Sequence, residues 1–351
     1  MKNLIIFDFD GLGNALLNLP LLVEMEKKFP NISYFCQENL IYKEEFFIDK
    51  LKLKKLKGCF PKIWGRFEKQ YLQDILDYIK LNQIDTLINF RNLGLDKNSN
   101  YIDFKNNFNI EEFKFIDFYT KDNKLKRFGK PTHIVLSKLA LLNKEGINIE
   151  HGNPLWLKDI ILPSSQNDKK IALFTGASKK VKLWDANEWI RLISFLLKHT
   201  TISIDVHIGF SEDEIFIGKA IKKYFKQIHK TKISNQLNFI SGLSFIDFCR
   251  SLSNTSLIIT NDTSTIHIGS ALGIPVIGLY LSTSATIWGG FSNKFIAVQS
   301  PFTFKCPDYH SIAGNCNFYF EGCPAPCKAD ITAEIVFQKV IKVIKNLNNN
   351  F

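Results

Sequence analysis

The sequence contains no run approaching the roughly 18 uncharged apolar residues that a membrane-spanning helix requires. It also lacks the pattern of a signal peptide, because the opening apolar run already reaches an acid at Asp8. No known nucleic-acid-binding module is recognisable, although the chain is basic. We therefore expect a cytoplasmic protein with no transmembrane segment and no nucleic-acid partner.

The composition is that of a globular protein with an excess of basic residues. A length of 351 residues suggests two ordinary domains, and the formal net charge of +11 favours anionic partners. Basic side chains are densest between Lys50 and Lys69, where Phe60, Trp64 and Phe67 are interleaved. This stretch is either a solvated face or a surface that meets an anionic acceptor or the lipid headgroups of the inner membrane.

Short apolar runs and amphipathic segments alternate along the whole chain. In the first half an apolar run over 4–9 leads through a glycine turn into a helix over about 14–28, and further strands are expected at 32–36 and 86–90. In the second half, strands are expected at 171–174, 202–208, 237–240, 257–260 and 275–281. Helices are expected near 185–198, from 212 onward, and over 244–252, 263–272 and 332–347.

This alternation predicts an α/β fold of two doubly wound, Rossmann-like domains that face each other across a cleft. The pattern is broken by the proline-containing segment 151–170, which we interpret as the linker. The predicted domains are therefore 1–160 and 161–330, followed by a final helix within 331–351. Because open α/β sheets bind ligands at the carboxyl ends of their strands, the cleft is the expected active site.

Two polar segments follow predicted strands and suit an anionic, diphosphate-like ligand. Small residues let backbone N–H groups approach a phosphate, and a lysine can neutralise it. The first segment consists of Thr175, Gly176, Ala177 and Ser178, with Lys182 just beyond. The second begins a helix and consists of Asp262, Thr263, Ser264, Thr265 and His267.

Each of these residues also has a purely structural explanation. Gly176 could serve only a turn, and Asp262 could be only a helix cap, because aspartate is strongly preferred there. His267 taken alone is more often a core histidine. What favours a binding site is the whole string from Thr260 to Ile277, because it resembles a known family.

The segments in their order resemble glycosyltransferase family 9, the heptosyltransferases. An amino-terminal loop of this family is similar to Gly11, Gly13 and Asn14 followed by Leu19-Pro20. Its central signature is similar to Thr175–Ser178 with Lys182, Trp184 and Trp189, and its later signature to Asp262–His267 followed by Ala271-Leu272-Gly273 and Pro275-Val276. The resemblance extends across most of the chain.

The resemblance implies a GT-B fold in which the final helix packs back on the first domain. It also implies an inverting transfer of a sugar, typically heptose from ADP-heptose, onto a lipopolysaccharide core or related surface glycan, without an obligatory metal cofactor. In this interpretation Lys182 and the helix start at Thr263–Thr265 hold the diphosphate, and Asp262 and His267 orient the donor. Glu212, at the start of a helix after Gly209, would bind the ribose, although an exposed first-turn glutamate is the ordinary alternative.

Asn14 departs from the family pattern. It occupies the position of the carboxylate that deprotonates the acceptor hydroxyl, and an amide cannot act as a base near neutral pH. Either Asp8, Asp10 or Asp96 supplies the base, which we favour, or the chain is a slow or non-catalytic nucleotide-sugar-binding relative. The acceptor is expected to be an anionic glycolipid, with an autotransporter-like protein as the alternative.

The first strand also resembles the opening of haloacid-dehalogenase-type phosphatases, through Asp8 and Asp10-Gly11. Against this, Leu12 replaces the Thr or Val expected after the glycine. The late segment around Asp262 also lacks the second acid needed to hold magnesium. A phosphatase is therefore the remote alternative.

The cysteines of the carboxyl-terminal region form a cluster. The four residues concerned are Cys306, Cys316, Cys323 and Cys327. Four thiolates could hold a structural zinc or iron tetrahedrally, but the spacing lacks paired CxxC knuckles. Relatives that glycosylate autotransporter proteins carry a metal-binding finger, so the resemblance implies either a structural metal or a loop without metal.

Overall fold

The computed structural model of this chain divides into two compact units, Met1–Asn153 and Pro154–Phe351. The boundary lies at the start of the proline-containing segment expected to be the linker. The residues described are 3–8, 12–29, 31–36, 77–90, 114–118, 132–161, 170–227, 235–307, 309–310, 315–316 and 326–348.

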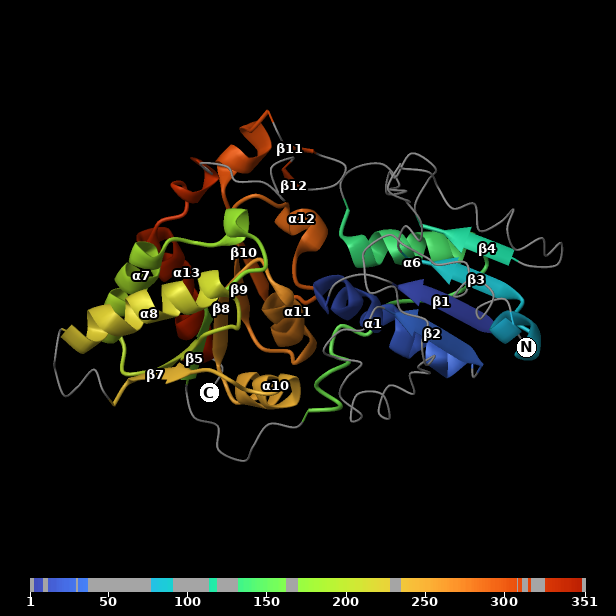
Figure 1. Ribbon diagram of the computed structural model, residues 1–351, viewed down its shortest axis with the longest axis horizontal. Helices are drawn as coiled ribbons and strands as arrows, with labels where there is room; N and C mark the ends of the chain where they lie inside the picture. The colour runs from blue at the N-terminus through green and yellow to red at the C-terminus, as the bar shows by residue number, and fades with distance from the viewer. Residues whose placement is uncertain are drawn as a thin grey trace. The chain divides into compact units, whose positions relative to one another are not determined.

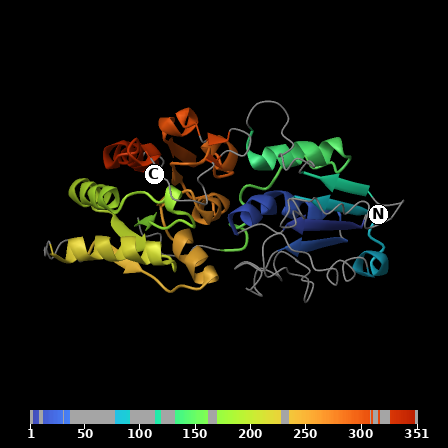
Figure 2. The ribbon, with the colours of Figure 1, turned by 45° about the horizontal axis from the view of Figure 1, so that its top comes forward.

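The first unit contains a parallel four-stranded sheet in the order β2-β1-β3-β4 (Figure 1). Its strands are β1 (Leu4–Asp8), β2 (Ile32–Cys36), β3 (Thr86–Asn89) and β4 (Lys114–Asp117). Two helices, α1 (Leu12–Lys28) and α6 (Ile134–Lys144), contact each other beside this sheet (Figure 2). Leu4, Ile5 and Ile6 are fully buried, as expected for a strand covered on both faces.

The second unit contains a parallel six-stranded sheet in the order β10-β9-β8-β5-β6-β7. The strands are β5 (Lys170–Phe174), β6 (Ser203–His207), β7 (Leu237–Ile240), β8 (Leu257–Asn261), β9 (Val276–Tyr280) and β10 (Phe295–Gln299). The helices are α7 (Ala186–His199), α8 (Glu212–Gln227), α10 (Phe245–Ser253), α11 (Ser264–Ala271), α12 (Ala285–Trp288) and α13 (Ala333–Asn348). The described residues also form the short 3-10 helices η1 (Lys180–Lys182), η2 (Pro301–Lys305) and η4 (Pro326–Lys328). Strand β11 (Tyr309–His310) pairs with strand β12 (Asn315–Cys316).

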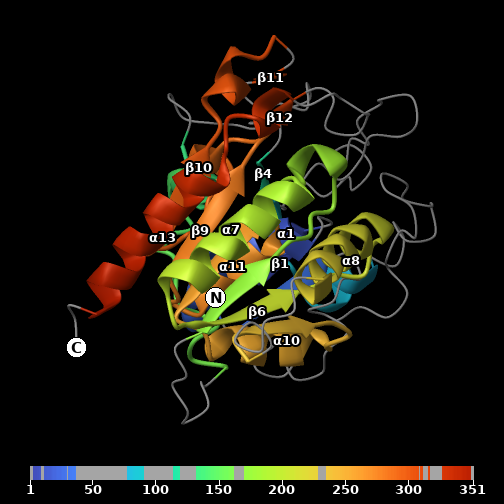
Figure 3. The same cartoon turned by 90° about the vertical axis from the view of Figure 1, so that its left-hand side faces the viewer.

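The main core of the second unit lies between the sheet and one layer of helices. Helix α7 contacts both α8 and α13 (Figure 3), and all three contribute buried side chains to one apolar cluster. On α7 these side chains include Trp189, Leu192 and Leu196, whose spacing repeats the helical period. The strands and helices predicted for this half of the sequence are therefore confirmed.

Helix α13 buries one face in the core of the second unit, through Val336, Val340 and Val343. That it also packs back on the first domain stays a prediction. The apolar stripe of α13 is thus used to cover α7 and the sheet of its own unit. None of the helices in the described residues is long and apolar enough to cross a membrane.

Candidate active site

The candidate site lies at the carboxyl ends of β5, β8 and β9, which are neighbours in the sheet of the second unit. Phe174 at the end of β5 pairs with Thr260 of β8, and Asn261 of β8 pairs with Leu279 of β9. The sheet order therefore places the segment after β5 beside the segment after β8, although more than 80 residues separate them. These are the two polar segments that the sequence singled out.

Asn261 ties the two segments together. Its buried side-chain amide donates to the carbonyl oxygens of Thr175, at 2.9 Å, and Gly176, at 3.0 Å. Its side-chain oxygen accepts from the backbone N–H of Trp184 at 3.2 Å. Trp184 is itself held, because its indole N–H donates to the carbonyl oxygen of Ile331 at 2.6 Å. One buried amide thus fixes the loop after β5 at both ends, a role that the sequence analysis did not identify.

Lys182 and Asp262 form an ion pair at the centre of the site. The Lys182 Nζ lies 2.7 Å from Asp262 Oδ2, and the two side chains are only 12% and 6% exposed. The hydroxyl of Thr283, in the loop after β9, donates to the same carboxylate oxygen at 2.6 Å. A lysine ammonium has three N–H donors, so a bond to one carboxylate oxygen does not by itself use all of them.

The charge of Asp262 also affects the pKa of Tyr280 on the neighbouring strand β9. Tyr280 is fully buried at the end of β9, and burial raises its pKa well above the ordinary value, with a further contribution from the Asp262 charge. The Tyr280 hydroxyl donates to the carbonyl oxygen of Trp288 at 2.9 Å. The phenol therefore stays neutral and structural, and the charged groups at the centre are Lys182 and Asp262.

The amino terminus of α11 opens next to this ion pair. Thr263 is the N-cap, and its hydroxyl accepts from the backbone N–H of Thr265 at 3.2 Å. Thr263 and Ser264 are half-buried, while Thr265 and His267 are buried. A helix amino terminus carries unpaired N–H groups and a partial positive charge, so it favours an anion. Together with the Lys182 ammonium, it makes this edge of the sheet suited to phosphate groups.

Glu214, rather than Glu212, lies against the loop after β5. Glu212 is exposed on the first turn of α8. The carboxylate of Glu214 approaches the backbone so closely that a Cβ atom at Gly176 or Gly209 would overlap it. Glu214 also accepts from the N–H of Ser211 at 2.9 Å in a capping box. The glycines therefore allow a carboxylate to lie at the ends of β5 and β6.

The remaining residues of the first polar segment differ in exposure. Thr175, Gly176 and Ala177 are buried, whereas Ser178 is exposed. The backbone of this segment is held by Asn261, and Ser178 is the member whose side chain is exposed.

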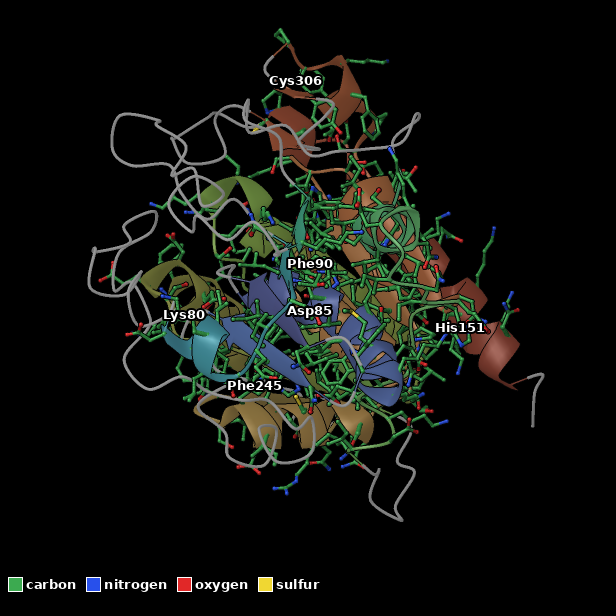
Figure 4. The ribbon with its side chains drawn as sticks, turned by 90° about the vertical axis from the view of Figure 1, so that its right-hand side faces the viewer. Lys80, Asp85, Phe90, His151, Phe245 and Cys306 are labelled. Carbon is green, nitrogen blue, oxygen red and sulfur yellow. The ribbon has the colours of Figure 1, made fainter. Side chains whose placement is uncertain are left out.

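The first unit has its own polar group at the strand ends. Lys138 of α6 is buried at 4% exposure and donates to the side-chain oxygen of Asn18 on α1. Its Nζ lies 5.0 Å from the ring centroid of Phe90, which directly follows β3 (Figure 4), and 5.5 Å from that of Phe118 after β4. Asn14 is half-buried one helical turn before Asn18. Lys138 was not identified from the sequence.

Several predicted site residues lie outside the described part of the chain. Asp10, Gly11 and Asp96 are among them, as is the basic stretch 50–69, whereas Gly13 lies in the first turn of α1. Cys323 is also outside, so the prediction of a four-cysteine metal site stays a prediction. Within the described residues, no three His, Cys, Asp or Glu side chains come together as a metal-binding group.

Comparison with known families decides the class of this protein. The model of glycosyltransferase family 9 (heptosyltransferase) matches residues 128–315, more than half of the chain and the whole of the site in the second unit. The chain belongs to glycosyltransferase family 9. It is therefore a glycosyltransferase, and the phosphatase alternative is set aside.

Solved structures of family 9 enzymes share the fold of this transferase. The E. coli heptosyltransferase WaaC with ADP is 15% identical, with a TM-score of 0.61 over 98% of this chain and 100% of that chain. The family 9 glycosyl transferase from Veillonella parvula DSM 2008 is also 15% identical, with a TM-score of 0.64 over 98% of this chain and 97% of that chain. E. coli ADP-heptose lps heptosyltransferase II is 14% identical, with a TM-score of 0.59 over 99% and 100%.

These likenesses confirm the predicted α/β fold of the GT-B type for the transferase. No curated protein matches the chain. At this level of identity the comparison concerns the fold, and the choice of donor and acceptor rests on the chemistry of the site.

Proposed function

We propose that this family 9 transferase moves a heptose from ADP-heptose onto a lipopolysaccharide core or a related surface glycan, with inversion at the anomeric carbon. The observation that carries the proposal is the nearly buried Lys182 beside the amino terminus of α11. An ammonium and a helix amino terminus at one sheet edge are suited to a diphosphate. Similar structures hold ADP and ADP-2-deoxy-2-fluoro heptose, which supports an ADP-sugar as the donor.

The proposed reaction is a single displacement. The acceptor hydroxyl oxygen attacks the anomeric carbon, the bond from that carbon to the diphosphate oxygen breaks, and ADP leaves with the bonding pair. Lys182 and the backbone N–H groups at Thr263–Thr265 would stabilise the charge that develops on the diphosphate. Asp262 would position Lys182 through the ion pair, and His267 would help to orient the donor.

Glu214 replaces Glu212 in the proposal as the group that binds the ribose. A carboxylate accepts hydrogen bonds from two adjacent hydroxyl groups, which is the pattern a ribose presents. The proposal is supported by the position of Glu214 against Gly176, in the same loop that leads to Lys182. The exposed Glu212 has only the ordinary role of an acid in the first turn of a helix.

The proton of the acceptor must go to a base other than Asn14. Asp8 at the end of β1, Asp10 and Asp96 are the candidates from the sequence. We expect Asp10→Asn or Asp8→Asn to lower the transfer rate strongly while ADP binding is kept, because a base acts only in the chemical step. Full activity in both variants would remove these two candidates and leave Asp96 to be tested in the same way.

Donor binding can be tested with the native protein. Thermal unfolding is followed with ADP, UDP, GDP and their sugars, because a ligand that binds only the folded state raises the midpoint. At 100 times its dissociation constant, ADP-heptose should add about 2.7 kcal/mol to the free energy of unfolding. A larger shift with UDP or GDP sugars would contradict the proposed donor, and transfer that survives EDTA would agree with a reaction that needs no metal.

Asn14 also supports a second candidate, a nucleotide-sugar-binding relative without activity. Transfer or donor hydrolysis in vitro would eliminate it. Incubation of ADP-heptose with either truncated lipopolysaccharide or an autotransporter protein separates the glycan acceptor from the protein acceptor. We expect product only on the glycan. Cytoplasmic location and contact with the inner membrane stay predictions.

A further inference from the structure

The second unit exposes an unusual concentration of large apolar side chains beside α8. Of the nine large hydrophobic residues that are exposed among the described residues, four lie between 210 and 224. They are Phe210 at 72% exposure, Phe216 at 71%, Tyr224 at 41% and Ile215 at 36%. Exposed apolar side chains that gather in one segment indicate an interaction surface more often than scattered ones do.

The same helix carries a row of lysines. Lys219, Lys222, Lys223 and Lys226 are exposed and follow the spacing i, i+3, i+4 and i+7, which places them on one face of α8. With Gln227 they line a hollow of about 590 Å³. Within the described part of the chain, none of the four forms an ion pair, although Lys222 also lies 5.7 Å from the ring centroid of Phe239.

The apolar and basic side chains share this face of α8. Ile215 and Phe216 precede Lys219 by four and three residues, so they lie on the same side one turn earlier. The opposite side of the helix, with Ile217 and Ile221, is buried in the core. The outer face from Ile215 to Lys226 thus carries Ile215, Phe216 and four lysines over about three helical turns.

We propose that the outer face of α8, from Ile215 to Lys226, docks the protein on an anionic phospholipid bilayer. Phosphate headgroups would meet the four lysines, and the hollow between them would receive headgroup oxygens. Phe216 would enter the boundary between headgroups and acyl chains, as aromatic residues of interfacial helices do. The proposed membrane contact therefore lies on the same unit as the proposed donor site. This proposal does not depend on which donor or acceptor the enzyme uses.

The test is co-sedimentation of the full chain with vesicles. Vesicles of phosphatidylcholine with phosphatidylglycerol are compared with vesicles of phosphatidylcholine alone. The variant with Lys219→Gln, Lys222→Gln and Lys223→Gln should bind the anionic vesicles at least about tenfold more weakly than the wild type. The reason is that each lysine near an anionic lipid surface adds to the affinity for it. Phe216→Ser should weaken binding several-fold.

A matched control removes the same charge elsewhere on the unit. Helix α13 carries Lys339, Lys342 and Lys345, which are also exposed. Their replacement by glutamine should change vesicle binding by less than about twofold, because they lie outside the proposed surface. All variants should keep the thermal midpoint and the donor-induced shift, so a failure of membrane binding is separate from a failure of the proposed transferase reaction.

Three results would overturn the proposal. The first is a wild-type protein that does not bind the anionic vesicles. The second is an equal loss in the α8 and α13 variants, which would mean that only net charge matters. The third is complete release by inorganic phosphate at the concentration of lipid phosphate, which would indicate a phosphate-binding site rather than a bilayer surface.

Discussion

Replacement of Lys182 by methionine should separate the structural role of the ion pair from its role in donor binding. The pair is nearly buried, with side-chain exposures of 12% and 6%. Removal of one partner of a buried pair typically costs about 3–5 kcal/mol. The Thr283 hydroxyl would still satisfy one oxygen of Asp262, so we expect Lys182→Met to lower the free energy of unfolding by about 3 kcal/mol.

The double variant Lys182→Met with Asp262→Asn should recover most of this loss. It contains no unpaired charge, and the side-chain oxygen of the introduced asparagine can still accept from Thr283. We expect it to lie within roughly 1 kcal/mol of the wild type, so that a double-mutant cycle gives a coupling of about 2 kcal/mol or more. For a unit of this size, Lys182→Met should lower the thermal midpoint by roughly 6–12 °C.

Donor binding should not recover in the double variant. A charge-assisted hydrogen bond to phosphate contributes about 1.5–3 kcal/mol, so both variants should bind ADP roughly tenfold to 100-fold more weakly. Urea unfolding gives the stabilities, and isothermal titration gives the affinities. The reasoning would be refuted by a double variant as unstable as Lys182→Met, or by a double variant that binds ADP like the wild type.

Three further predictions concern His207, Asn261 and Glu214. Burial lowers the pKa of His207 to about 4. Because the unfolded chain then binds the proton more strongly, urea unfolding should show a loss of up to about 3 kcal/mol as the pH falls from roughly 6.5 to 4. The His207→Asn variant should lack this loss. If the variant instead shows the same pH dependence of stability as the wild type, His207 is not the origin of the loss. Asn261→Ala removes three buried hydrogen bonds and should cost about 3 kcal/mol, whereas the exposed Asn238→Ala should cost less than about 1 kcal/mol in the same assay. Glu214→Gln should weaken ADP binding about tenfold in calorimetry, whereas Glu212→Gln should leave it unchanged. If Glu212→Gln weakens ADP binding and Glu214→Gln does not, the ribose is bound by Glu212, as the sequence predicted.

The sequence alone was sufficient for most elements of the second unit and for its two polar segments, although α12 and β10 were not predicted. Strands such as 257–260 and helices such as 185–198 are determined by hydrophobic periodicity within a few residues, which a single sequence displays directly. Thr175–Ser178 and Asp262–His267 were identified because small and hydroxyl residues directly follow such strands. These are local properties, and the structure places the two segments side by side, as a parallel sheet requires.

The tertiary structure alone decided which distant side chains meet. Asn261 and Glu214 acquire their positions because β5 lies between β6 and β8, an order that no local pattern specifies. Lys138 meets Asn18 across 120 residues of sequence because α6 packs against α1 in the first unit. The apolar stripe of α13 predicted burial but not its partner, since any apolar face of suitable width satisfies it. Local periodicity fixes the elements, whereas the energy of packing them together fixes the neighbours of each side chain.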